Sequence, residues 1–363
     1  MSTVLIFLIV IIVLVVVHEL GHFFVAKAFG VRVDEFGVGY PPRARKLFTW
    51  RNTLFTLNWL PFGGFVKIYG EETASGDTRD SFAHQKLWKR VAVVLAGIVA
   101  NIVLAMVLYT ASFSIGFLSS PSDFPEYVTN TPSMTMITGV TEKSPAQIAG
   151  LVSSDRITAV ATRSDTKIPE NVTDIVTFVK KHPTDAISFT IIHAGNTKTV
   201  SVTPRIDPAT NIPSVGISLA QVVYVRLPFL AACKMSVYYT LQQFVFILHS
   251  IGTLISGAFG GGNSLLSQVS GPVGIAQVAG EAYSLGFGSF LAFVALISVN
   301  LAVINILPFP ALDGGRCILE FFAKDGRSRI PRKVVSAINQ ISFLLLIVLM
   351  LYVTYHDIVR LFV

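Results

Sequence analysis

Residues 4–22 read VLIFLIVIIVLVVVHELGH, an apolar run that ends in His18, Glu19 and His22. Because positions i and i+4 share one face of a helix, both histidines can offer a ring nitrogen to one metal ion. The pattern HExxH is typical of zinc hydrolases, in which the glutamate acts as general base. A long apolar run also predicts a membrane-spanning helix. The stretch therefore predicts a Zn²⁺ site at membrane depth, with His18 and His22 as ligands and Glu19 as catalytic residue.

The composition is that of a membrane protein. Hydrophobic residues make up 52% and charged residues 13% of the 363 positions, and the mean hydropathy is +0.64. Soluble globular chains of this length rarely show such values. The net charge of +7 comes from basic segments beside apolar runs, so we expect no nucleic-acid partner. Cys233 and Cys317 are expected on opposite sides of the membrane, which excludes a disulfide framework.

Four apolar segments are long enough to span a bilayer, at about residues 4–29, 91–118, 287–307 and 338–353. The first lacks a basic leader and a small-residue cleavage site, so we expect it to be retained rather than removed as a signal peptide. A fifth segment, 227–259, is apolar but carries Lys234, Gln242, Gln243 and His249. For this segment we favour a helix on the membrane surface or against the core over a true span.

Lysine and arginine counts orient the chain. Residues 27–90 hold eleven of them and residues 316–333 hold six, whereas the long section 119–286 holds only ten. Because short cytoplasmic loops carry the excess of basic residues, the first two segments are expected on the cytoplasmic side. Both termini and the long section are then expected to be extracytoplasmic.

Residues 133–205 are less hydrophobic and predict a small folded domain. Alternating apolar and polar residues predict strands, as at 187–191 and 199–202, with a hairpin turn at 194–196. Two helices are predicted by their capping residues, at Pro145–Gly150 after Ser144 and at Val172–Lys181.

The pattern from Lys143 to Leu151, followed by Asp155-Arg156-Ile157, resembles a PDZ domain of the bacterial type. Ser154 stands where such domains usually have a glycine. The resemblance implies one small α/β PDZ-like domain, which we expect over residues 128–206. Such a domain either binds a peptide C-terminus left by an earlier cut or acts as a size filter against bulky substrates, and the sequence does not decide between these roles.

A catalytic zinc ion needs a third protein ligand. No other histidine lies in a predicted span, and Asp313 is the better candidate. It follows the third span in the stretch NILPFPALDGG, residues 305–315, where prolines end a regular helix and glycines permit a tight turn. Alternatively, Asp313 only caps the next helix. The expected orientation places it at the same cytoplasmic depth as the two histidines, so we predict it as the third metal ligand.

The HExxH motif, the NxxPxPxLDG motif that begins at Asn305, the PDZ-like section and the four spans together resemble the site-2 protease family of intramembrane zinc metalloproteases, of the bacterial regulator-of-sigma-E protease type. The likeness extends to several further stretches, at 18–26, 36–41, 60–70, 96–101 and 271–275. Two features depart from the family pattern. Ala96-Gly97-Ile98 replaces Ala-Gly-Pro, and only one PDZ-like unit is present where many relatives carry two.

The resemblance implies roles for individual residues. His18, His22 and Asp313 correspond to the zinc ligands, Glu19 corresponds to the catalytic base, and Asn305 is expected to hold substrate or the developing oxyanion. The family also implies a bacterial inner-membrane location, the lipid bilayer as surroundings, and single-span proteins as substrates. Anti-sigma factors and signal-peptide remnants are the substrate classes that it suggests.

Residues 53–68 alternate like two strands around Pro61-Phe-Gly-Gly64. A peptide bond inside a helix is shielded by its own turns, so a substrate must be held extended before it is cut. We expect a membrane-associated β-hairpin here that pairs with the unwound substrate, with Gly63, Gly64 and Phe65 as substrate-binding residues. The alternative is an ordinary amphipathic hairpin on the cytoplasmic surface. Gly271-Pro-Val-Gly-Ile275 is either a hinge or gate before the third span or a tight turn.

The expected fold is an α-helical integral membrane protein with four transmembrane helices, the membrane-associated hairpin and the PDZ-like domain. The expected divisions are two spans with HExxH and the hairpin, the PDZ-like domain, an extracytoplasmic or membrane-surface helical region, and two spans with the LDG motif, at 1–118, 128–206, 207–286 and 287–363. The function expected is zinc-dependent intramembrane proteolysis, usually after a first extracytoplasmic cut. An inactive PDZ-containing membrane scaffold is the alternative, and a transporter would require internal repeats that the sequence lacks.

Overall fold

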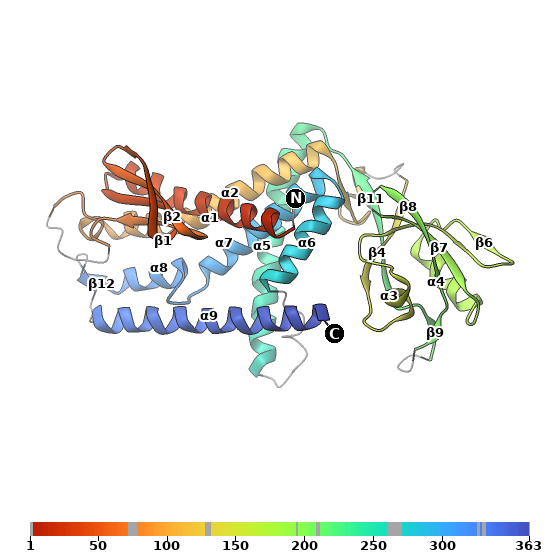
Figure 1. The fold of residues 1–363 in the computed structure, drawn as a ribbon. Coiled ribbons are helices and arrows are strands. Elements are labelled where there is room, and N and C mark those ends of the chain that lie inside the picture. Colours follow the sequence, from red (N-terminus) through yellow and green to blue (C-terminus); the bar gives the residue numbers. More distant parts are fainter. Residues whose placement is uncertain are drawn as a thin grey trace. The chain divides into compact units, whose positions relative to one another are not determined.

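The computed structural model describes residues 3–71, 78–127, 132–193, 195–207, 211–259, 271–324, 327–328 and 332–362 (Figure 1). The chain forms two compact units. The first comprises Met1–Thr110, Cys233–Gly280 and Phe293–Phe362, and the second comprises Ala111–Ala232 and Glu281–Ala292.

Four helices of the described chain are long and apolar enough to cross a membrane. They are α1 (Thr3–Ala28), α2 (Leu87–Ile115), α7 (Phe287–Ile306) and α9 (Arg332–Phe362) (Figure 1). These are the four spans predicted from hydropathy. The long helix α5 (Phe229–Phe259) covers the fifth apolar segment and is not among the four. Its position against the membrane surface stays a prediction.

Helices α1 and α2 approach each other closely beside the HExxH motif. A Cβ atom added at Gly21 of α1 would come within 2.4 Å of the Ala96 carbonyl oxygen and 2.8 Å of Ala100 Cβ, both on α2. Only a glycine therefore permits this contact. Helix α7 is joined to α2 by a hydrogen bond of 2.8 Å that the Ser298 hydroxyl donates to the Asn101 carbonyl. These contacts fix the helices that surround the motif.

Two long strands, β1 (Val33–Trp50) and β2 (Thr53–Ile68), pair with each other beside α1. The register places Val38 opposite both Leu57 and Gly64, and Phe36 opposite both Phe55 and Val66. The first half of β1 therefore lies between the two halves of β2.

This arrangement corrects the predicted hairpin within residues 53–68. The chain does reverse near Pro61–Gly64, but the two halves do not pair with each other, because residues 33–38 lie between them. Residues 64–68 have their strand partner on one side only among the described residues, so they form an edge of the sheet.

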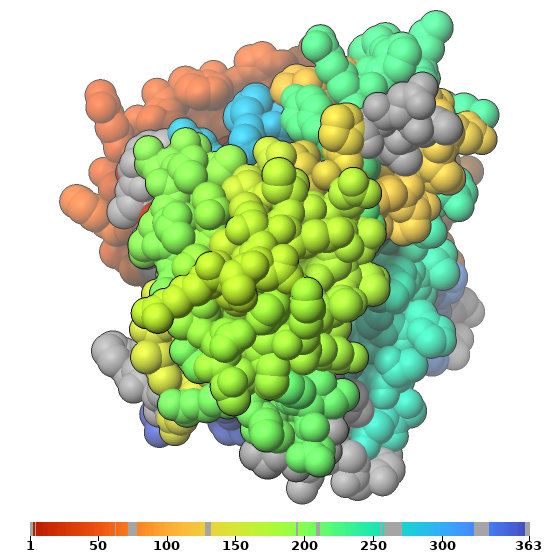
Figure 2. Space-filling model, turned by 90° about the vertical axis from the view of Figure 1, so that its right-hand side faces the viewer, coloured from red at the N-terminus to blue at the C-terminus, as the bar shows by residue number. Residues whose placement is uncertain are grey.

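The second unit is built on a seven-stranded sheet in the order β3-β11-β4-β5-β7-β8, with β6 paired to β5. The strands are β3 (Phe117–Ser119), β4 (Met134–Val140), β5 (Arg156–Ala161), β6 (Thr166–Lys167), β7 (Ile187–His193), β8 (Asn196–Val202) and β11 (Ile217–Val225). The yellow to green residues in Figure 2 show one face of this unit. Apolar side chains of β4, β5, β7 and β8 and of two helices form its core.

Both helices predicted in this section are confirmed, as α3 (Pro145–Ala149) and α4 (Val172–Lys181). The Ser144 side chain accepts a hydrogen bond from the Gln147 amide, and Asn171 and Asp174 form a capping box. Strands β7 and β8 form the predicted hairpin, although Ala194 of its turn lies outside the described residues. A separate pair of short strands is formed by β9 (Arg205–Ile206) and β10 (Pro213–Ser214).

The expected helical region 207–286 needs correction at its start, and the segment Gly271–Ile275 needs correction as a tight turn. Residues 217–225 form β11, which pairs with β4 and β3, so the sheet extends beyond 128–206 in both directions. The segment Gly271–Ile275 is not a tight turn, because it begins helix α6 (Pro272–Ser284). The Asp357 carboxylate of α9 accepts hydrogen bonds from the Gly271 and Gly274 amides, at 3.1 and 2.9 Å, which satisfies this helix end.

The remaining elements are short. Helix α8 (Asp313–Phe321) follows α7 and leads to the strand pair β12 (Ala323–Lys324) and β13 (Arg327–Ser328). Single 3₁₀ turns occur at Phe82–His84 and Pro125–Tyr127.

The α1–α2 contact can be tested with two matched glycine substitutions. Gly21→Ala should lower the free energy of unfolding by about 1–3 kcal/mol, because the added methyl group overlaps the α2 backbone. Gly252→Ala lies in α5 at a position where an added Cβ would meet no other part of the protein within 4 Å, so it should instead stabilise by up to about 1 kcal/mol through helix propensity. Denaturation of both variants in detergent measures the difference. Equal effects would contradict the close approach.

Candidate metal centre

The HExxH histidines lie on the face of α1 that packs against α2. His18 and His22 are one helical turn apart, both are buried, and their ring centroids are 4.8 Å apart. Gly97 of α2 lies directly beside them, since an added Cβ would come within 2.4 Å of His22 Nε2 and 2.7 Å of His18 Nε2. A side chain at position 97 would therefore fill the space in front of the two ring nitrogens.

Asp313 reaches the same point from the C-terminal part of the chain. Helix α7 ends at Ile306, and the prolines at 308 and 310 prevent its continuation. The chain then turns, with a hydrogen bond from the Leu312 amide to the Phe309 carbonyl, and α8 begins at Asp313. The break in the helix thus presents a carboxylate at the first position of a new helix.

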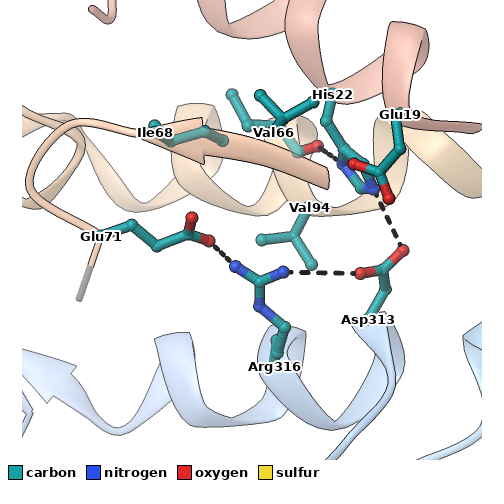
Figure 3. Close-up of a pocket in the computed structure, with 9 residues that line it drawn as sticks. Glu19, His22, Val66, Ile68, Glu71, Val94, Asp313 and Arg316 are labelled. Carbon is teal, nitrogen blue, oxygen red and sulfur yellow. Dashed lines mark hydrogen bonds and ion pairs between the residues drawn. The ribbon is translucent and has the colours of Figure 1, made fainter. Parts of the chain in front are cut away.

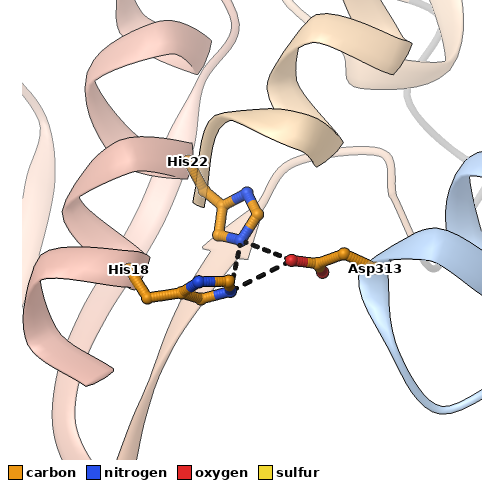
Figure 4. Close-up of side chains that lie close together, drawn as sticks. All are labelled: His18, His22 and Asp313. Atoms are coloured by element: carbon orange, nitrogen blue, oxygen red, sulfur yellow. Dashed lines mark hydrogen bonds and ion pairs between the residues drawn. The ribbon is translucent and has the colours of Figure 1, made fainter. Parts of the chain in front are cut away.

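The three side chains converge on one point (Figure 4). His18 Nε2 lies 3.0 Å and His22 Nε2 lies 3.3 Å from Asp313 Oδ2, and the two Nε2 atoms are 3.1 Å apart. All three residues are buried, and among the described residues they form the one group with metal-ligand geometry. The structure therefore brings together the three ligands expected from the sequence.

This donor set fits a zinc ion. Two imidazole nitrogens and one carboxylate oxygen are ligands that zinc prefers, and three protein ligands leave a fourth position open. Asp313 Oδ2 is buried and accepts no aligned hydrogen bond from the described residues, although both ring nitrogens are near it. A buried carboxylate oxygen that faces two imidazole nitrogens is placed as a metal ligand would be.

Each ligand also contacts a second group on its far side. His22 Nδ1 lies 2.8 Å from the Val93 carbonyl oxygen, and His18 Nδ1 lies 3.3 Å from Asn101 Nδ2. Asp313 Oδ1 lies 3.9 Å from a guanidinium nitrogen of Arg316, one turn further along α8. Contacts of this kind orient metal ligands and set which ring nitrogen is free to bind.

A cavity opens beside His22 and Asp313 (Figure 3). Glu19 and His22 line it from α1. The other lining residues come from the β2 edge and the turn after it, from α2 and from α8: Val66, Ile68, Glu71, Val93, Val94, Asp313 and Arg316. Figure 3 shows the Arg316 guanidinium between Glu71 and Asp313, and an ion pair joins it to Glu71. The cavity thus brings together the Glu19 carboxyl group, two of the three candidate metal ligands and the edge of strand β2.

The four residues predicted to bind substrate differ in how close they lie to the site. Gly64 lies against the site, since an added Cβ would be 3.4 Å from Glu19 Cγ. Gly63 and Phe65 contact Tyr40 instead, and Asn305 is half-buried on the last turn of α7. None of these four is among the described residues that line the cavity.

Several residues near the site were missed by sequence reasoning. Val66 and Ile68 were inside the predicted hairpin but were not singled out, and Glu71 lies three positions after its end. Arg316 could have been found, because it lies three positions after Asp313 and helical spacing places it on the same face. Asn101 ends the family-like stretch 96–101 but was not singled out, because its contact, His18, lies 83 positions away in the sequence.

Comparison with known proteins agrees with this geometry. A putative zinc metalloprotease of Clostridium perfringens is 35% identical over 353 residues, which cover 95% of both chains. The zinc metalloprotease RasP of Geobacillus kaustophilus is 27% identical over 96% of both chains. The chloroplastic membrane metalloprotease ARASP of Arabidopsis thaliana is 29% identical over 95% of this chain and 76% of that protein.

The family model described as Peptidase family M50 matches residues 6–349, a range that includes both histidines, Glu19 and Asp313. The match extends over nearly the whole chain, and the relatives align over most of their own length as well. The chain therefore belongs to peptidase family M50.

Proposed function

We propose that this protein is a zinc-dependent endopeptidase that cleaves single-span membrane proteins within the bilayer, usually after a first cut outside it. The observation that carries the proposal is the convergence of His18, His22 and Asp313 beside Glu19, with both histidines on an apolar helix long enough to span. Of the named relatives, one is described as a zinc metalloprotease, one as a putative zinc metalloprotease and one as a membrane metalloprotease. The ligand cluster, the apolar helix that carries it and the names of the relatives all support a zinc protease in a membrane.

The chemistry follows from the positions of the side chains. A zinc ion held by the three ligands would supply a Lewis acid that polarises the scissile carbonyl. Glu19 directly follows the ligand His18 in the sequence and lines the same cavity as His22 and Asp313, so its carboxylate can take a proton from the attacking water. The same carboxyl group can then pass this proton to the leaving amine. His22 and Asp313 meanwhile stay fixed by Val93 and Arg316.

The edge of β2 provides a means to hold the substrate extended. Residues 64–68 lack a strand partner on one side among the described residues, and Val66 and Ile68 line the cavity. An unwound substrate segment could pair with this edge by main-chain hydrogen bonds, as peptides do when they extend a sheet. The proposal moves substrate contact from Gly63 and Phe65 toward Val66 and Ile68. Gly64 keeps its place beside Glu19.

The second unit suggests how trimmed substrates are recognised. Residues 217–222 of β11 pair with β4, and β3 pairs only with 223–225, so one edge of 217–222 has no strand partner in the described chain. We propose that this PDZ-like unit binds a peptide C-terminus left by the first cut, rather than acting only as a size filter. The unit and both chain termini are proposed to be extracytoplasmic, in a bacterial inner membrane, because basic residues concentrate elsewhere.

The metal site is tested by separating binding from catalysis. His22→Ala and Asp313→Ala should each lose bound zinc after purification, because each removes a ligand. Glu19→Gln should keep its zinc and lose cleavage of a single-span substrate by at least about 100-fold, because it removes only the base. Elemental analysis and a cleavage assay in nanodiscs measure both quantities. Zinc retained in both ligand variants, or cleavage by Glu19→Gln at the normal rate, would refute the proposal in favour of an inactive scaffold.

Proline substitutions test the β2 edge. Val66→Pro should lower kcat/KM for a membrane substrate by at least about tenfold, because proline disrupts the strand edge that would pair with it. Leu47→Pro provides the control, since Leu47 is exposed, lies at the other edge of the sheet in the second half of β1, and has no partner in the β1–β2 register. Bound zinc should be unchanged in both variants. A similar loss of activity in both would argue against substrate pairing at residues 64–68.

Peptide binding by the second unit has its own test. Peptides with a free terminal carboxylate should bind the full chain, and C-terminally amidated versions should bind at least about tenfold more weakly, as measured by fluorescence anisotropy. Equal binding of both forms would rule out recognition of a C-terminus. Faster cleavage of trimmed than of untrimmed substrates without any peptide binding would identify the size filter instead.

A further inference from the structure

The structure assigns a positioning role to Asn101: its side-chain amide holds the ring proton of His18 on Nδ1 and so directs Nε2 toward the metal. This inference rests on the proposed zinc site and adds a residue to it. Asn101 lies on α2, near the middle of a predicted span, and is fully buried. A fully buried amide in this setting needs hydrogen-bond partners.

The ring nitrogen that faces the site is identified by three contacts. His18 Nε2 lies 3.0 Å from Asp313 Oδ2 and 3.1 Å from His22 Nε2, whereas His18 Nδ1 points to Asn101. A metal bound at Nε2 requires a free electron pair on that atom, so the single proton of the neutral ring must be on Nδ1. His18 Nδ1–H then needs an acceptor.

The Asn101 amide can supply that acceptor. In the orientation of the structure Nδ2, which only donates, lies 3.3 Å from His18 Nδ1, while Oδ1 is buried with no hydrogen-bond partner among the described residues. Rotation of the amide by 180° exchanges two atoms of nearly equal size and moves no other group. Oδ1 then accepts the His18 Nδ1–H hydrogen bond, and the unpaired atom becomes Nδ2. The rotated form is the one compatible with metal binding at Nε2.

The two histidines differ in this respect. The contact of His22 Nδ1 is the Val93 main-chain carbonyl, at 2.8 Å, which can only accept. The His22 ring proton is therefore fixed by the backbone, and no substitution of Val93 removes that acceptor. The corresponding contact of His18 is a side chain, so it can be altered by mutation. Asn101 is thus the residue through which the ligand geometry of His18 can be tested separately.

A purely structural role of Asn101 can be distinguished because the same residue also joins two helices. That contact uses its main-chain carbonyl, which accepts the hydrogen bond from Ser298 of α7. Substitution of the Asn101 side chain leaves this carbonyl in place, and Ser298→Ala removes the helix contact while leaving the side chain intact. The two variants therefore separate histidine positioning from helix packing.

The test measures the affinity of the purified full chain for Zn²⁺ alone, by competition with a chromophoric chelator. Asn101→Leu, which has similar volume and no acceptor, should raise the Zn²⁺ dissociation constant by about 10- to 100-fold. Asn101→Asp keeps an oxygen at the same position and should stay within about threefold of the unaltered protein. Ser298→Ala should also stay within about threefold. Unaltered affinity in Asn101→Leu, or an equal loss in Asn101→Asp, would overturn the assignment.

A second measurement does not depend on the folding of Asn101→Leu. In the zinc-loaded protein with ¹⁵N-labelled histidine, the Asn101→Asp substitution should shift the Nδ1 resonance of one metal-bound histidine and leave that of the other unchanged. Metal binding of His18 through Nδ1 would overturn the inference. Failure of the unaltered protein to bind zinc would instead refute the proposed function, so the two failures are distinguishable.

Discussion

The rest of the site depends on one constraint: polar atoms at membrane depth must have partners inside the protein, because lipid offers none. His18 and His22 occur on a helix that is otherwise almost entirely apolar. All four ring nitrogens have a polar neighbour. Both Nε2 atoms face Asp313 and each other, whereas Nδ1 of His22 faces the Val93 carbonyl and Nδ1 of His18 faces the Asn101 side chain. This requirement explains why α2 must approach α1 so closely at Gly21 and Gly97. It also explains why α7 must end where it does, so that a carboxylate reaches the pair.

Local patterns predicted the parts of the molecule whose geometry is local. The i,i+4 spacing placed both histidines on one face, and the hydropathy of four segments identified the long apolar helices. The capping residues located α3 and α4 closely. Asp313 was singled out because prolines and glycines mark a broken helix, and because the basic-residue counts were expected to place that break at the depth of the histidines. The structure places its carboxylate beside both rings. These features could be predicted because each depends on a few neighbouring residues or on a simple count.

Pairings between distant residues could not be predicted in the same way. Alternation in residues 53–68 predicts strands, but nothing in it identifies the partner, and residues 33–38 lie between the two halves. The same limit applies to β11, whose partners β3 and β4 are about 80 to 100 positions earlier in the chain. The contact between Asn101 and His18 depends on the rotation of one helix against another. The pattern of a single helix does not contain this rotation, so Asn101 was not singled out although it ends the family-like stretch 96–101.

The position of Asp313 in the chain has a consequence for biosynthesis. The two histidines and the complete β1–β2 sheet lie within the first 68 residues, whereas the third ligand follows His22 after about 300 further residues. At roughly 5–20 residues per second, a ribosome adds that length in about 15–60 s. During this interval the nascent chain holds only two of the three clustered side chains. The order of synthesis therefore leaves the cluster incomplete until the start of α8 has been made.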